Sequence, residues 1–160
     1  CTITNGVVEL DELKKAADEY NGFGDVAAKS NMIMTLHNEG FELAKLPDGR
    51  LVYHVLFEYL NPKTVFMQYQ MSTAPTTGDP VSLFQKWPNR FRSLHLQGLR
   101  KGAVTGGGNN QVALGSPDDM FDWPKVLTSA KTSGGITNYF VEQNWDLFVQ
   151  SIAYLKTLSI

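Results

Sequence analysis

Four short segments of the chain alternate between apolar and polar residues. They cover residues 32–39, 64–70, 91–97 and 137–142. Because successive side chains of an extended strand point to opposite faces, this period predicts four β-strands. One face of these strands collects the apolar side chains, namely Met34, Leu36, Met67, Tyr69, Leu94, Leu96, Tyr139 and Val141.

The opposite face collects carboxylates, imidazoles and amides, mostly near the C-terminal ends of the predicted strands. The members of this polar set are Thr35, His37, Glu39, Gln68, Gln70, Ser93, His95, Gln97 and Glu142. Polar groups on an inner sheet face cost free energy unless they are hydrogen-bonded or serve a function. The pattern therefore indicates a functional site at one end of the sheet.

The segments between the strands have helical spacing of apolar residues. We expect helices over residues 9–28, 51–60, 79–87, 122–131 and 144–158. Asp79 has the character of an N-cap, with Pro80 at the first helical position. The segments 72–78 and 98–119 are predicted to be loops. Gly106–Asn110 in the second loop is rich in glycine, but no GK[ST] sequence follows, so we interpret it as flexible surface rather than a phosphate site.

The resulting order is one helix followed by four strand–helix units. Strands that alternate with helices predict an α/β fold with parallel strands and right-handed crossovers. Two architectures fit, an open α/β sheet and part of a (β/α)₈ barrel. The polar face favours the barrel, because an open sheet covered on both sides needs apolar residues on both faces. We therefore predict half of a TIM barrel, with about four strands, helices outside and residues 1–160 forming a single domain.

Length, charge and composition restrict the function. With 160 residues and a net charge of −2, a binder of nucleic-acid backbones is disfavoured, so we expect no nucleic-acid partner. No apolar run approaches the roughly 20 residues that cross a bilayer, and we expect no membrane partner. Cys1 stands alone, so no internal disulfide is expected. It also replaces an initial Met, which predicts a truncated form or a fragment of a full barrel. For the compartment we favour the cytoplasm, with the periplasm as the alternative.

Several motifs occur in an order that resembles one known family. They are His37-Asn-Glu-Gly-Phe-Glu42, Gly78-Asp-Pro-Val81, Lys86-Trp-Pro-Asn-Arg-Phe91, Ser93-Leu-His-Leu96 and Tyr139-Phe-Val-Glu-Gln143. Together they resemble the sugar phosphate isomerase/epimerase family of xylose-isomerase-like TIM barrels. The resemblance covers nearly the whole chain but only the C-terminal half of the eight-unit barrel. It implies that Cys1–Thr4 is the remnant of a further strand.

The resemblance also implies a metal site, since many members bind a divalent ion through Glu, Asp, His and Glu. Carried over to this chain, the last two ligands are His95 and Glu142. Gln70, or alternatively Gln68, stands in place of the Asp. Glu39 fits the first position by its facing, with Glu42 as its rival. An amide binds Mn²⁺, Mg²⁺ or Zn²⁺ less well than a carboxylate, so the missing Asp makes the metal doubtful.

For chemistry, the resemblance implies proton abstraction next to the carbonyl of a keto sugar. Glu39 and Glu142 are then the acid/base pair, while His37, Gln68 and Gln97 contact the sugar. The residues by themselves leave a second interpretation open: His95 and Glu142 form a structural hydrogen bond, and the glutamines fill a polar interior. Activity is expected to need the complete barrel.

Two other functions stay open at this point. One is a non-catalytic half barrel that binds sugar or acts in assembly, and the other is a keto-glycoside lyase or hydrolase, which starts with the same proton abstraction. Four strands leave two sheet edges exposed, and exposed edges invite pairing. We therefore expect either self-association or docking of the missing N-terminal half barrel.

Overall fold

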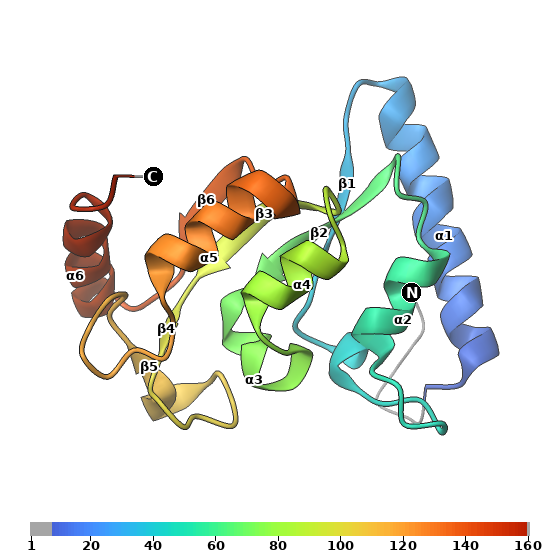
Figure 1. Ribbon diagram of the computed structural model, residues 1–160. Coiled ribbons are helices and arrows are strands. Elements are labelled where there is room, and N and C mark those ends of the chain that lie inside the picture. The colour runs from blue at the N-terminus through green and yellow to red at the C-terminus, as the bar shows by residue number, and fades with distance from the viewer. Residues whose placement is uncertain (1–7, 160) are drawn as a thin grey trace. The chain divides into compact units, whose positions relative to one another are not determined.

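The computed structural model describes residues 8–159 of the chain (Figure 1). These residues fall into two compact units, Cys1–Met67 (unit 1) and Gln68–Ile160 (unit 2). The boundary lies inside one strand, β2. The prediction of a single domain over residues 1–160 stays a prediction.

Four parallel strands form the main sheet, in the order β1-β2-β3-β6. Their bounds are Met34–His37 for β1, Val65–Gln70 for β2, Phe91–Leu96 for β3 and Asn138–Val141 for β6. In unit 2, β3 pairs with β6 in parallel, with Leu94 opposite Tyr139 and His95 opposite Phe140. The predicted strands and the α/β class are confirmed. Among the described strands, β1 and β6 are the sheet edges, so the sheet is not closed.

Unit 1 packs two helices, α1 (Leu10–Lys29) and α2 (Val52–Tyr59), beside β1 and the start of β2. A short 3₁₀ turn, η1 (Phe41–Leu43), follows β1. Helix α1 lies very close to the strand at Gly24, where an added Cβ atom would be 2.7 Å from Cγ2 of Val65. A side chain at this position would overlap the strand, so the glycine allows the close approach.

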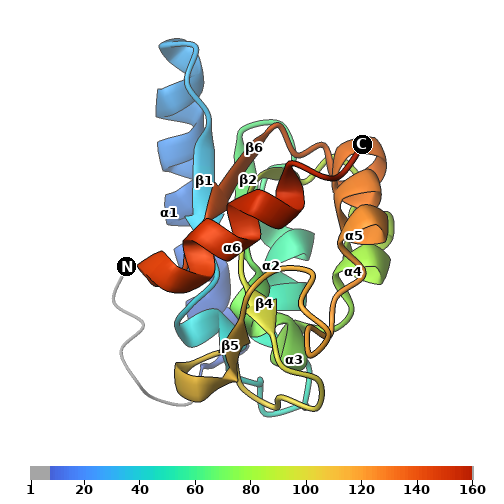
Figure 2. The same ribbon diagram turned by 90° about the vertical axis from the view of Figure 1, so that its left-hand side faces the viewer.

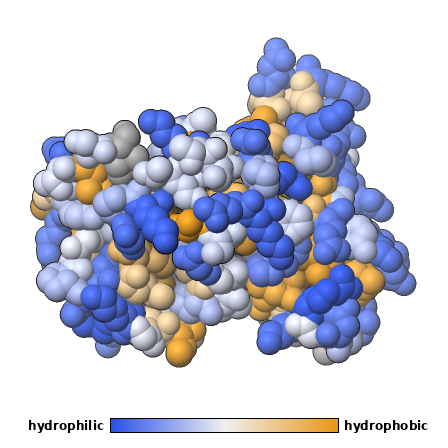
Figure 3. Space-filling view, viewed as in Figure 1, coloured by the Kyte–Doolittle hydropathy of each residue, from blue (hydrophilic) through white to orange (hydrophobic). Residues whose placement is uncertain are grey.

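Unit 2 carries three longer helical segments, α4 (Pro80–Lys86), α5 (Trp123–Ser129) and α6 (Trp145–Leu155). A π-helical turn, η4 (Ala130–Gly134), continues α5. Each helix starts at a side-chain cap, because Asp79, Asp122 and Asn144 accept hydrogen bonds from backbone N–H groups of the first turn. The predicted cap at Asp79 is confirmed. The outward faces of α4 and α5 are mainly hydrophilic (Figure 3), as expected of an outer helical layer.

Apolar side chains of β2 and β3 form the core of unit 2, as their alternation predicts. Tyr69, Leu94 and Leu96 are buried, and Tyr69 packs edge-on against Phe84 and Phe91. The edge strand β6 departs from this pattern, since Tyr139 is 39% exposed and Phe140 is 49% exposed. An edge strand has a neighbour on one side only, and this leaves its side chains less covered.

The segment 72–78, predicted as a loop, is helical instead. It forms η2 (Met71–Thr73) and α3 (Ala74–Thr77). Threonine hydroxyls stabilise the turns, because Thr73 Oγ1 donates to the Gln70 carbonyl and Thr77 Oγ1 lies 2.7 Å from the Tyr69 hydroxyl. The prediction was wrong because these polar residues bond to local and buried partners rather than to water.

The long segment 98–119, also predicted as a loop, contains regular secondary structure. It contains strands β4 (Gly98–Leu99) and β5 (Gln111–Val112), which pair antiparallel, and a 3₁₀ turn, η3 (Gly108–Asn110). This ribbon and helix α6 can be followed in Figure 2. The predicted strand remnant at Cys1–Thr4 lies outside the described residues. Within residues 8–159, no helix is both long enough and apolar enough to span a membrane.

Candidate functional site

Three of the predicted site residues meet at one carboxylate oxygen in unit 2. Glu142 Oε2 lies 2.8 Å from His95 Nδ1 and accepts a 2.6 Å hydrogen bond from Gln70 Nε2. These residues come from the ends of β6, β3 and β2, which places them at the C-terminal edge of the sheet. The expected proximity of His95 and Glu142 is confirmed, whereas their chemical role stays a prediction.

The three side chains of the cluster range from buried to half-exposed. Gln70 is buried, the His95 side chain is 19% exposed and the Glu142 side chain is 50% exposed. The His95 ring contacts Phe140 edge-on, with 5.5 Å between ring centroids. Phe140 was not singled out from the sequence, although strand alternation puts it on the same face as Glu142. The result is a carboxylate that is oriented from inside and accessible from outside.

Gln97 forms a hydrogen bond with the backbone of Glu142. Its Nε2 donates to the Glu142 carbonyl oxygen over 2.8 Å, and the Glu142 N–H donates to the Leu96 carbonyl over 3.2 Å. Gln97 is buried, so its amide N–H group is used within the fold. Its predicted contact with sugar stays a prediction. Gln68, two residues before Gln70 on β2, is partly buried.

The other predicted residues belong to unit 1, where they pair with each other. His37 Nε2 lies 3.3 Å from Glu39 Oε2, and the side chains are 31% and 62% exposed. This pair sits at the end of a single strand. An exposed pair of this kind is expected to contribute little free energy.

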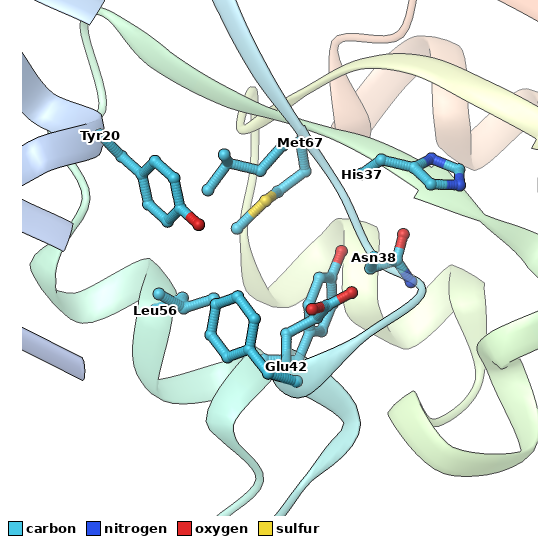
Figure 4. A pocket seen from close by; sticks show the side chains of 9 residues that line it. Tyr20, His37, Asn38, Glu42, Leu56 and Met67 are labelled. Carbon is cyan, nitrogen blue, oxygen red and sulfur yellow. The ribbon is translucent and has the colours of Figure 1, made fainter. Parts of the chain in front are cut away.

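Glu42, the rival of Glu39 as a ligand, is buried beside a small cavity of unit 1. Its Oε1 accepts a 2.7 Å hydrogen bond from the Gly40 N–H, and the residue is 5% exposed. The cavity measures about 30 Å³ and is lined by Tyr20, Leu36, His37, Asn38, Phe41, Glu42, Tyr53, Leu56 and Met67 (Figure 4). Burial, and after it the charge of Glu42, raises the pKa of Tyr20. The volume suits a water molecule rather than a sugar.

A larger groove of about 560 Å³ lies on the other face of the β3–β6 pair. It is lined mainly by apolar residues, among them Leu96, Ile136 and Tyr139, together with Lys131. Burial raises the pKa of Tyr139. Because side chains alternate along a strand, Leu96 and Tyr139 point away from the face that carries His95. The groove is therefore separate from the Glu142 cluster.

The cluster of unit 2 does not provide a complete metal-ligand set. Gln70 directs an N–H donor, not an oxygen, at Glu142, so it orients the carboxylate instead of adding a ligand. His95 and Glu142 alone leave the set short of the three or four ligands that Zn²⁺ takes from protein. Among residues 8–159 no group of three or more His, Cys, Asp or Glu side chains is gathered closely enough to hold an ion. The residues fit proton transfer better than metal binding, and the predicted metal stays a prediction.

The comparison with known proteins shows the fold. No protein-family model and no curated protein sequence matches the chain. Two solved structures of sugar phosphate isomerase/epimerase from Parabacteroides distasonis do match it. One has 20% identity and a TM-score of 0.71, over 96% of this chain and 55% of that one. The other has 21% identity and a TM-score of 0.74, over 98% of this chain and 57% of that one.

A third match is a xylose isomerase domain protein from Planctomyces limnophilus. It has 18% identity and a TM-score of 0.57, over 91% of this chain and 50% of that one. The chain thus spans about half the length of the solved structures that it resembles. The resemblance inferred from the motifs is confirmed at the level of fold, as an α/β sheet of the kind found in part of a TIM barrel.

Proposed function

We propose that the chain carries one side of a sugar isomerase or epimerase site, with Glu142 as a proton-transfer group. The observation that supports this is the convergence of His95 and Gln70 on a single carboxylate oxygen of the half-exposed Glu142 side chain, at the C-terminal ends of adjacent strands. In barrel enzymes of this architecture the active site lies at that end. The fold shared with structures of sugar isomerases and epimerases agrees with the choice of substrate class.

The proposed reaction is the movement of a proton next to the carbonyl of a keto sugar. The Glu142 carboxylate removes a proton from the carbon beside the carbonyl, and the C–H electrons form an enediolate. A proton returned to the former carbonyl carbon, with transfer of the adjacent hydroxyl proton to the former carbonyl oxygen, isomerises the sugar. A proton returned to the opposite face of the original carbon restores the carbonyl and epimerises the sugar. His95 and Gln70 hold the carboxylate in one orientation, which a general base requires. No step of this proposal passes through a metal.

Hydrogen–deuterium exchange tests the proposal directly. The chain is incubated in D₂O with fructose or fructose 6-phosphate, and NMR follows the loss of the signal from the proton next to the carbonyl. We expect exchange with the wild type, either alone or together with a separately produced N-terminal half barrel, and a loss of roughly 10²- to 10⁴-fold in Glu142→Gln under the same conditions. Glu12→Gln, on the first turn of α1, is the control and should exchange at the wild-type rate. Exchange that survives in Glu142→Gln would contradict the assignment.

The same samples separate the alternatives. Sugar binding without exchange, seen by saturation-transfer NMR, favours a non-catalytic sugar-binding module. Glu39→Gln tests the second predicted acid/base residue by the same exchange rate. If exchange appears only after addition of a separately produced N-terminal half barrel, the activity belongs to the complete barrel. Absence of binding and exchange in both cases would contradict both functions.

Calorimetric titration with Mn²⁺ tests the metal prediction independently. Binding heat in the wild type that disappears in His95→Ala would support a metal site that includes His95. Equal and negligible heats in both proteins would contradict it.

A further inference from the structure

Helix α6 buries a serine rather than an apolar side chain. Ser151 is fully buried and is the most deeply buried residue of α6. Its hydroxyl accepts a 2.9 Å hydrogen bond from the Leu114 N–H and donates a 2.6 Å hydrogen bond to Gln143 Oε1. Both bonding directions of the hydroxyl are therefore used.

Gln143 directly follows Glu142 and is held at both ends of its amide. Oε1 accepts from Ser151, and Nε2 donates over 2.7 Å to the Val112 carbonyl. The side chain thus bridges α6 and the end of β5. A buried polar network in which each member is satisfied rigidifies the segments that it joins.

The backbone of Glu142 is also held, by the hydrogen bonds with Gln97 and Leu96 described above. β4 starts directly after Gln97 and pairs with β5, with Gly98 opposite Val112. Both supports of Glu142 therefore meet in the same ribbon.

The ribbon of β4 and β5, together with Gln97, Gln143 and Ser151, forms a frame around Glu142. Two further contacts hold this frame together. Asp119 accepts hydrogen bonds from the N–H groups of Leu99 and Gly115, over 3.2 and 2.9 Å. Gly115 has a φ of +72°, and an added Cβ atom there would overlap the ring of Tyr154 on α6. The segment after β5 is thereby fixed both to β4 and to α6.

We propose that Gln143 and Ser151 are positioning residues that set the Glu142 carboxylate against His95. In this role they link the ribbon of β4 and β5 to the proton-transfer group without touching substrate. The catalytic consequence rests on the function proposed above, whereas the effect on the contact between Glu142 and His95 does not. The two consequences are therefore measured separately.

Two pairs of matched variants test the proposal. Ser151→Ala removes the hydroxyl of the network, and Ser116→Ala removes a buried hydroxyl that has no hydrogen-bond partner among the described residues. Gln143→Met removes the bridging amide, and Gln150→Met removes an exposed amide that bonds to the Asp146 carbonyl of its own helix. Circular dichroism and thermal melting establish that each variant is folded.

The first measurement is the ¹⁵N chemical shift of His95 Nδ1, which reports its hydrogen bond. Glu142→Gln defines the shift of the altered contact. We expect Ser151→Ala and Gln143→Met to move the shift at least halfway from the wild-type value to that reference, while both controls stay at the wild-type value. A folded Ser151→Ala or Gln143→Met protein with the wild-type shift would show that the network is merely structural and would overturn the proposal. If Ser151→Ala does not fold, Gln143→Met decides.

The second measurement is the sugar exchange reaction. Because a displacement of about 1 Å costs up to about 100-fold in rate, we expect a loss of roughly tenfold to 100-fold in turnover with KM nearly unchanged. A moved His95 shift without exchange in any protein would sustain the positioning role and contradict the proposed function. Wild-type exchange in a folded Ser151→Ala protein would overturn the positioning role alone.

Discussion

Each of the two units presents a histidine beside a glutamate, but the pairs are built differently. In unit 1, His37 and Glu39 lie two residues apart at the end of one strand, 3.3 Å from each other. In unit 2, His95 and Glu142 come from neighbouring strands, lie 2.8 Å apart and are supported by a buried glutamine. The difference shows that a polar pair becomes a defined site when separate elements hold each partner. His37 and Glu39, by contrast, both come from the end of β1.

Breaking the frame of unit 2 should have the largest effect on stability. Asp119 is buried, and its carboxylate also accepts hydrogen bonds from Phe121 N and Trp123 Nε1, besides those from Leu99 and Gly115. Burial raises the pKa of Asp119, against the effect of these donors. In Asp119→Ala the buried donors lose their acceptor, so we expect a loss of about 3 kcal/mol or more in urea denaturation. Asp48→Ala, at an exposed turn of unit 1, is the control and should show no comparable loss.

The buried side chain of Tyr69 on β2 should make the free energy of unfolding depend on pH. Burial raises the pKa of Tyr69 to about 12, from 10.0 in its model compound. The unfolded chain therefore releases this proton first, and stability falls as pH rises from 10 to 12. The linked loss is about 3 kcal/mol, since one pKa unit corresponds to about 1.4 kcal/mol. Below pH 10 this contribution is fully present.

Tyr69→Phe should remove this part of the pH dependence. Urea denaturation of the wild type and the variant at pH 9 and at pH 11.5 gives the comparison. The variant should lose about 1 kcal/mol at pH 9, because the hydrogen bond to Thr77 is absent, yet show a shallower decline at higher pH. An equally steep decline in both proteins would mean that Tyr69 does not titrate as a buried group.

The packing of unit 1 is tested by two glycines of the same helix. Gly24→Ala places a methyl group against Val65 and Thr64, and we expect a loss of about 2 kcal/mol from overpacking. Gly22→Ala meets no atom within 4 Å, and we expect a gain of about 0.5–1 kcal/mol from helix propensity. Thermal denaturation measures both. Effects of the same sign would contradict the close approach of α1 to β2.

The smallest expected effect is that of the two histidines on stability. We expect His95→Ala to lose about 1 kcal/mol, because the carboxylate contact and the packing on Phe140 disappear. His37→Ala removes an exposed pair and should lose less than about 0.5 kcal/mol. Urea denaturation at pH 7 measures both variants. Equal losses would show that the two pairs are equivalent in spite of their different settings.

Much of the fold was predictable from local patterns. The alternation located the strands, and the cap at Asp79 marked a helix start, because a short polar side chain before an apolar run satisfies free N–H groups. The segments 72–78 and 98–119 were not predictable in this way. Their polar residues bond to buried or distant partners, as Asp119 does across 20 residues to Leu99.

The candidate site, like the fold, was predictable only in part. The sequence by itself determined that His95 and Glu142 share a strand face, since side-chain parity follows from the extended backbone alone. Only the tertiary structure decided that Gln70 donates to Glu142, that Glu42 lines a small cavity, and that Gln143 and Ser151 are hydrogen-bonded to each other. Such contacts depend on the register and approach of elements far apart in the chain, and a short sequence pattern carries no information about either.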